Sequence, residues 1–185
     1  MPENSEEADH AAMARLCAGD DLALNEIMER WKRPLTSYLC RWIGHEHEAV
    51  DLAQETFVRI YENRRTYRPD GKFSSWLWTI AANLARNQKR WHARHPQVPL
   101  ELEPDLPAAA STPDQSILQR ELTRRIQAAV QELPGDLRTA FLLFESEGQT
   151  YDDIAVIAGC SRKAVETRLY RARHMLREKL QEFRS

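Results

Sequence analysis

Apolar residues recur along most of the chain at the three-to-four spacing of amphipathic helices. The clearest stripes are Leu22, Leu24, Ile27, Met28 and Trp31, followed by Leu35, Tyr38, Leu39, Trp42 and Ile43. No segment shows the strict alternation of apolar and polar residues that marks a half-buried strand. The pattern therefore predicts an all-α protein.

Proline and glycine divide the first half of the chain into four predicted helices. Pro34 should kink the second helix or start a new segment, and Gly44 should end it. A third helix is expected at about 46–66 and a fourth at about 74–92. These helices would form a first domain at residues 1–95.

The helical pattern stops at residues 96–113, where five prolines interrupt the chain and the only charges are acidic. Such a composition is typical of a flexible linker. Pro113 then suits the first turn of a new helix, which Pro134 should break, and a short helix should follow. We expect two small helical domains, with the second at residues 114–185.

The segment after Thr150 has the pattern of a helix-turn-helix. Thr150 and Asp153 fit a capping box, and Gly159 can close the short helix that follows. Ser161 can cap a second helix whose outward positions are rich in arginine and lysine. In a helix-turn-helix, such a second helix enters the major groove of DNA. The alternative is a plain helical hairpin with a solvated charged face.

The formal net charge of −2 hides a strong segregation of sign along the chain. Basic residues dominate 56–95 and again the stretch from Ser161 onward, which predicts two phosphate-facing surfaces. An extended linker of about 18 residues would reach roughly 55 Å. One turn of duplex is about 34 Å, so the two domains could occupy separate DNA sites.

The second basic block carries a family resemblance. Its motifs, Thr150-Tyr-Asp-Asp-Ile-Ala, Gly159-Cys-Ser and Arg168-Leu-Tyr-Arg-Ala-Arg, resemble region 4.2 of extracytoplasmic-function (ECF) sigma factors, which binds the minus-35 promoter element. Many members have a basic or neutral residue where this chain has Glu166, and a carboxylate there can accept from cytosine N4. The resemblance implies minus-35 contacts by Arg162, Lys163, Glu166, Thr167, Arg168, Tyr170, Arg171 and Arg173.

The first domain matches the same family independently. Residues 51–57, Asp-Leu-Ala-Gln-Glu-Thr-Phe, look like region 2.2, the helix by which these factors grip the clamp coiled coil of RNA polymerase. The resemblance implies contacts with core polymerase by Asp51, Gln54, Glu55 and Phe57. The first three of these share one helix face, at i, i+3 and i+4.

Residues 73–87 resemble regions 2.3 and 2.4, which open and read the minus-10 element, and residues 67–72 match the loop around a flipped base. Trp76 is expected to be mostly packing, whereas base contact and packing both stay open for Trp78. The minus-10 contacts that the resemblance implies are Tyr67, Lys72, Trp78, Asn83, Arg86, Asn87 and Arg90.

As a whole, the resemblance implies an initiation factor with no catalytic activity and no cofactor. Its implied partners are core RNA polymerase, through the β′ clamp and the β flap, promoter DNA and an anti-sigma factor. An acidic N-terminus and the lack of a long apolar stretch favour a cytoplasmic protein without membrane insertion. The isolated residues Cys17, Cys40 and Cys160 are expected to be reduced core cysteines.

Two other classes of protein compete with this prediction. A metal enzyme would use His45 and His47, but residues two apart point to different sides of a helix, and no His-Glu-x-x-His spacing occurs. A two-domain transcriptional regulator would bind its operator tightly without polymerase. That interpretation leaves residues 51–57 and the first basic block unexplained.

Overall fold

The computed structural model describes residues 3–95 and 113–182, and all regular secondary structure in these ranges is helical. The predicted all-α class is therefore confirmed for the described part of the chain. The predicted linker lies outside the described residues except for Pro113. The elements are α1 (Glu3–Ala18), α2 (Ala23–Ile43), α3 (Glu46–Glu62), the 3-10 turn η1 (Arg64–Thr66), α4 (Phe73–Arg94), α5 (Pro113–Glu132), α6 (Gly135–Glu145), α7 (Tyr151–Ala158) and α8 (Arg162–Glu182).

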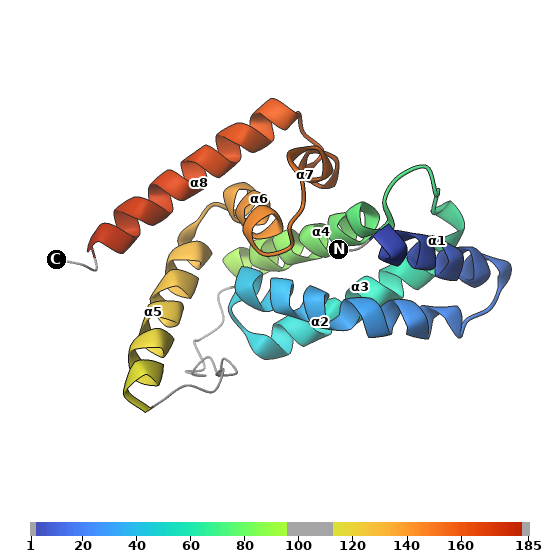
Figure 1. The fold of residues 1–185 in the computed structure, drawn as a ribbon, viewed down its shortest axis with the longest axis horizontal. Coiled ribbons are helices and arrows are strands. Elements are labelled where there is room, and N and C mark those ends of the chain that lie inside the picture. Colours follow the sequence, from blue (N-terminus) through green and yellow to red (C-terminus); the bar gives the residue numbers. More distant parts are fainter. Residues whose placement is uncertain (1–2, 96–112, 183–185) are drawn as a thin grey trace.

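Helices α1 to α4 pack into one bundle (Figure 1). Large side chains that the helical stripes placed on one face fill its core, among them Trp31, Tyr38 and Trp42, each at most 2% exposed. Burial of large aromatic side chains supplies much of the stability of a small domain, so these residues fix how α2 packs against its neighbours.

Two of the predicted boundaries need correction or refinement. Pro34 does not end α2, which continues on both sides of it. A proline inside a helix removes one hydrogen bond, but buried Trp31 and Leu35 flank this one and hold both turns against the core. The third helix ends at Glu62 rather than near residue 66, because η1 takes over its last turn.

The capping signals near the second domain are confirmed. Thr150 accepts from the Asp153 amide, and the Asp153 carboxylate accepts from the Thr150 amide, which completes the predicted capping box. Gly159 closes α7 with a φ of 59°, a left-handed conformation that favours glycine. The Ser161 hydroxyl accepts from the Ala164 amide at 3.2 Å and so caps α8.

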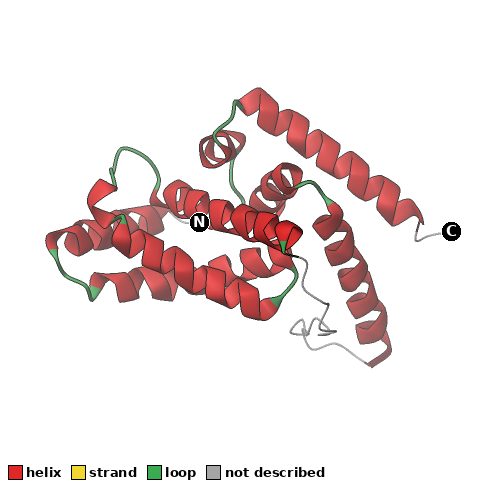
Figure 2. Cartoon of the chain, turned by 180° about the vertical axis from the view of Figure 1, so that it is seen from behind, coloured by secondary structure: helices red, strands yellow, loops and turns green. Residues whose placement is uncertain are grey.

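Helices α5 to α8 form the second group, in which α8 crosses both α6 and α5 (Figure 2). This group is not separate from the first, because α2 contacts α5 and α6, and α4 contacts α7. At the α2–α6 contact, Trp42 Nε1 donates to Thr139 Oγ1 at 3.1 Å. Buried Arg138 donates to the Trp42 carbonyl at 2.6 Å, and its guanidinium lies over the Trp42 ring. The two predicted domains therefore share a built interface.

The cysteines are unpaired, and their surroundings differ from the prediction: Cys17 is exposed, whereas Cys40 and Cys160 are half-buried. Within the ranges that the structure describes, every helix is too short or too polar to traverse a lipid bilayer.

Candidate nucleic-acid interface

Helix α3 presents a polar patch to solvent. Asp51 and Gln54 are exposed, and Glu55 is half-buried and accepts from Arg59 Nε at 2.7 Å. Phe57, predicted to contact polymerase, is buried and only 4% exposed. Phe57 therefore belongs to the core of the bundle and helps to fix α3, the helix that carries the patch.

The loop between η1 and α4 is organised around Tyr67. The Tyr67 ring is half-buried and packs against Trp76, with ring centroids 5.0 Å apart, and against Phe73 at 6.0 Å. Its hydroxyl shares a hydrogen bond of 2.6 Å with His10 Nδ1. Burial raises the pKa of Tyr67, so the hydroxyl stays protonated.

Trp76 and Trp78 lie near the start of α4, and both pack against other aromatic rings, as expected for Trp76. Trp78 is 1% exposed and packs edge-on against Trp31, with centroids 5.8 Å apart, and against Tyr38 at 5.0 Å. A ring enclosed in this way cannot reach a base, which corrects the expectation of a minus-10 contact for Trp78. Trp76 is half-buried, so part of its ring faces solvent beside Tyr67.

The outward face of α4 carries the remaining residues that were predicted for the minus-10 element. Asn83, Asn87 and Arg90 are exposed and fall at i, i+4 and i+7, which places them on one face. Arg86 is half-buried beside them and donates to Asn83 Oδ1 at 2.7 Å. Amide groups offer both donors and acceptors, so this face can bind the edge of an unpaired base.

Helices α7 and α8 form the predicted helix-turn-helix. Val165, Leu169, Ala172 and Leu176 are buried and fix one side of α8 against α6. Seven of the eight predicted minus-35 residues are exposed on α8, with Arg168 half-buried: Arg162, Lys163, Glu166, Thr167, Tyr170, Arg171 and Arg173.

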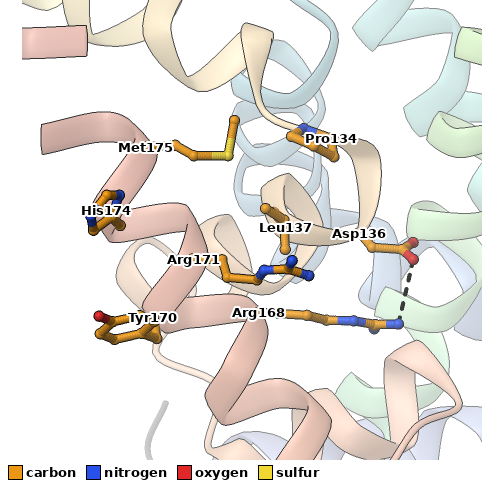
Figure 3. Close-up of a pocket in the computed structure, with 8 residues that line it drawn as sticks. All are labelled: Pro134, Asp136, Leu137, Arg168, Tyr170, Arg171, His174 and Met175. Atoms are coloured by element: carbon orange, nitrogen blue, oxygen red, sulfur yellow. Dashed lines mark hydrogen bonds and ion pairs between the residues drawn. The ribbon is translucent and has the colours of Figure 1, made fainter. Parts of the chain in front are cut away.

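A groove runs between α8 and the start of α6, and side chains leave α8 on both of its sides (Figure 3). Arg168 and Arg171 extend toward Asp136 and Leu137, and Arg168 Nη2 lies 3.4 Å from Asp136 Oδ2. Tyr170 points the other way and is 70% exposed. Tyr170 is thus an aromatic side chain of α8 that is open to solvent.

Carboxylates within the second domain pair with several cations of α8. Arg162 lies 2.5 Å from Asp152, and Arg173 lies 2.9 Å from Glu145. Lys163 donates to Glu166 at 2.8 Å, and this hydrogen bond lowers the pKa of Glu166. Glu166 is therefore ionised at neutral pH and acts as an acceptor.

Carboxylates of the second domain also pair with cations of the first. Lys72 Nζ lies 2.9 Å from Asp153, and Arg86 Nη1 lies 3.6 Å from Asp136. The sequence motifs mark Asp153 only as part of a capping box and give Asp136 no role, so the partners of both acids across the interface were missed. No local pattern reveals them, because the residues of each pair are far apart in the sequence.

The competing metal site finds no support in the geometry. Across the described residues, no group of three or more histidine, cysteine, aspartate or glutamate side chains is arranged to hold a metal ion. His45 and His47 are both exposed.

The comparisons with known proteins agree with this geometry. Residues 27–95 match Sigma-70 region 2, and residues 123–176 match Sigma-70, region 4. The ECF RNA polymerase sigma-E factor of Haemophilus influenzae is 32% identical over 181 residues, which cover 94% of this chain and 95% of that protein. The RNA polymerase sigma-H factor of Pseudomonas aeruginosa is 30% identical, with 96% of each chain covered.

Solved structures show the same fold. The sigma factor RpoE of Bartonella quintana, in complex with the anti-sigma factor NepR, superposes with a TM-score of 0.69 at 25% identity, covering 85% of this chain and 96% of that one. CnrH in complex with the cytosolic domain of CnrY gives a TM-score of 0.73 at 24% identity, covering 95% of this chain and 98% of that one.

The two-region architecture and the helix-turn-helix define a promoter-recognition subunit of bacterial RNA polymerase. This chain belongs to the ECF sigma factors of the sigma-70 family. The membership sets aside both the metal enzyme and the regulator that acts without polymerase.

Proposed function

We propose that residues 1–95 dock on the polymerase clamp and read the minus-10 element, that residues 114–185 read the minus-35 element, and that residues 96–113 connect the two. One observation carries the proposal: Asn83, Asn87 and Arg90 share an exposed face of α4, the helix that the Tyr67 loop leads into. Polar base-reading groups beside an aromatic platform are what recognition of unpaired bases requires.

The polymerase contact is assigned to Asp51, Gln54 and Glu55. The support is their shared face on α3, where two of them are exposed, and the burial of Phe57, which fixes the helix in the bundle. The β flap is the second proposed contact on core polymerase, as the family resemblance implies.

On the minus-10 side, Tyr67 and the α4 face would bind opened DNA, with Lys72, Arg86 and Arg90 on phosphates. On the minus-35 side, Glu166, Thr167, Tyr170 and Arg171 would face base edges. The proposed phosphate contacts are those of Arg162, Lys163, Arg168 and Arg173. A charged side chain can bind a phosphate whatever the base sequence is. Such contacts act by binding alone, so the protein would have no catalytic activity of its own.

An anti-sigma factor is the proposed regulatory partner, and the cytoplasm the proposed location. The support comes from the comparison structures, since the RpoE of Bartonella quintana is bound to the anti-sigma factor NepR.

The polymerase contact is tested by reversing the charge of the α3 patch. Asp51→Arg with Gln54→Arg should abolish binding to core polymerase and promoter-dependent run-off transcription, because the clamp would meet cations in place of acceptors. The measurement is a pull-down with core polymerase followed by run-off transcription.

The matched control is Asn25→Arg with Glu29→Arg, two exposed α2 positions that undergo the same kinds of change. The control should retain binding. The assignment is wrong if the α3 variant folds by circular dichroism and still binds core polymerase as tightly as the control does.

A further inference from the structure

One face of α1 follows the segment that leads into α4. Glu6, His10 and Cys17 fall at i, i+4 and i+11, so they share that face. Each makes a hydrogen bond to residues 64–74, as the adjacent ribbons indicate (Figure 1). The match to Sigma-70 region 2 begins only at residue 27, so none of these contacts is part of the recognised motif.

Glu6 caps a helix to which it does not belong. The N-cap residue of α4, Lys72, makes no side-chain cap, and the first turn of α4 has no acid. The Glu6 carboxylate accepts from the Phe73 amide at 2.9 Å and the Ser74 amide at 3.3 Å, and it also accepts from the Ser74 hydroxyl. A carboxylate at this position satisfies unpaired amides and favours the helix dipole, so Glu6 defines where the loop ends and α4 begins.

His10 and Cys17 hold the other side of the same segment. His10 Nδ1 bonds the Tyr67 hydroxyl, which fixes the ring that Phe73 and Trp76 already flank. The Cys17 thiol donates to the Arg64 carbonyl at 2.9 Å. The segment is therefore attached to α1 at its start, middle and end.

Helix α1 is itself anchored to α2 behind it. Asp9 is fully buried and accepts from Arg30 Nε at 2.7 Å and from Trp31 Nε1 at 2.9 Å. The Trp31 ring in turn packs against Phe73. Because these contacts fix α1 to α2, a shift of α1 would also shift the loop that it holds.

We infer that Glu6 and His10 are positioning residues for minus-10 recognition: α1 holds the Tyr67–Lys72 loop and the start of α4 in the shape that receives an unpaired base. The inference rests on the proposed role of Tyr67 and adds a set of residues that does not touch DNA. The reading of one minus-10 base then depends on side chains in α1.

The test uses holoenzyme assembled from the full chain with Glu6→Ala, with His10→Ala, or with the matched control Glu7→Ala. Glu7 is exposed on the same helix and carries the same charge. Three quantities are measured: affinity for core polymerase, the motif selected from a randomised minus-10 library, and the fluorescence of 2-aminopurine placed at each minus-10 position in turn.

We expect Glu6→Ala and His10→Ala to reduce open complexes by about fivefold to tenfold, the size expected when a helix cap is lost. They should relax preference, and lower the 2-aminopurine signal, at the same single position as Tyr67→Ala. Affinity for core polymerase and the minus-35 motif should not change, and Glu7→Ala should match the unaltered protein. His10→Asn, which keeps an acceptor near the Nδ1 position, should restore the motif.

A purely structural α1 would give another result, in which the variants lower the melting temperature and all promoters lose activity alike while the selected motif is unchanged. That result overturns the inference. If Glu6→Ala does not fold, His10→Ala carries the test, and an unchanged motif in it counts equally against the inference. If Tyr67→Ala leaves the motif unchanged, the proposed minus-10 role itself fails, which is a separate outcome.

Discussion

Burial separates the arginines of this chain into structural residues and residues proposed to face DNA. Arg138 is 3% exposed, and burial lowers its pKa to about 10. Its guanidinium donates to the Trp42 and Leu133 carbonyls inside the protein. Arg162 and Arg171 keep their charged groups in solvent. In the sequence each of them is simply a basic residue. Packing in the folded protein separates the structural arginine from those proposed to face DNA.

Glu166 offers the sharpest test at the residue scale. Glu166→Arg removes a possible acceptor for cytosine N4 and supplies a donor for guanine, so the selected minus-35 motif should change. The expected discrimination is about 1 to 3 kcal/mol at one base pair, measured by selection from a randomised minus-35 library.

Glu178→Arg is the matched control, because Glu178 is also an exposed glutamate of α8 but lies three turns further along the helix. It should leave the motif unchanged, and the minus-10 motif should be constant in both variants. An identical minus-35 motif for Glu166→Arg would remove this residue from the reading surface.

Helix ends were the most predictable elements, because their signals are local. The glycine at the end of α2 and the capping box of α7 each depend on a few consecutive residues, and both occur as predicted. Pro34 and Trp78 were harder, since each depends on neighbours from other helices. The tertiary packing around Trp31 determines both the continuity of α2 at Pro34 and the burial of Trp78. The spacing of residues along the sequence does not reveal this packing.

Asp153 takes part in the capping box of α7 and also pairs with Lys72 of the first domain. Its replacement should produce a pH-dependent loss of stability. Burial opposes its ionisation, but hydrogen bonds from Thr150 and Lys72 outweigh this and hold the pKa of Asp153 below its ordinary value of 3.8. A lowered carboxyl pKa stabilises the fold above the unfolded-state value, and the contribution is lost as pH falls through the folded-state value. Asp153→Asn should therefore cost about 1 kcal/mol at neutral pH.

The difference from the unaltered protein should close as the pH falls below 3.8, which urea unfolding at a series of pH values would measure. Asp152→Asn is the control, since Asp152 is its exposed neighbour and pairs only with Arg162 among the ion pairs described. A loss for Asp153→Asn that stays constant down to acid pH would show that shape, rather than charge, accounts for its contribution.

At the scale of the whole molecule, carboxylates of the second domain pair with cations of the first domain that are proposed to bind DNA. A carboxylate 2.9 Å from Lys72 Nζ occupies the place that a phosphate would take. The segregation of charge predicted two basic stretches, one in each domain. The contact between the domains was not predictable, because it joins Asp136 and Asp153 to residues some fifty to eighty positions away.

This arrangement predicts that the contact between the domains opens when one central charge is reversed. Asp136 lies between Arg86 of α4 and Arg168 of α8, so Asp136→Lys replaces two attractions with two repulsions. Since the linker can extend to roughly 55 Å, the radius of gyration from small-angle X-ray scattering should increase, most clearly at low salt where screening is weakest. Glu145→Lys is the matched control, because Glu145 pairs with Arg173 inside the second domain and its reversal should leave the domains in contact. If Asp136→Lys scatters like the control, the contact depends instead on the hydrogen bonds of Trp42 and Arg138, and charge does not hold it closed.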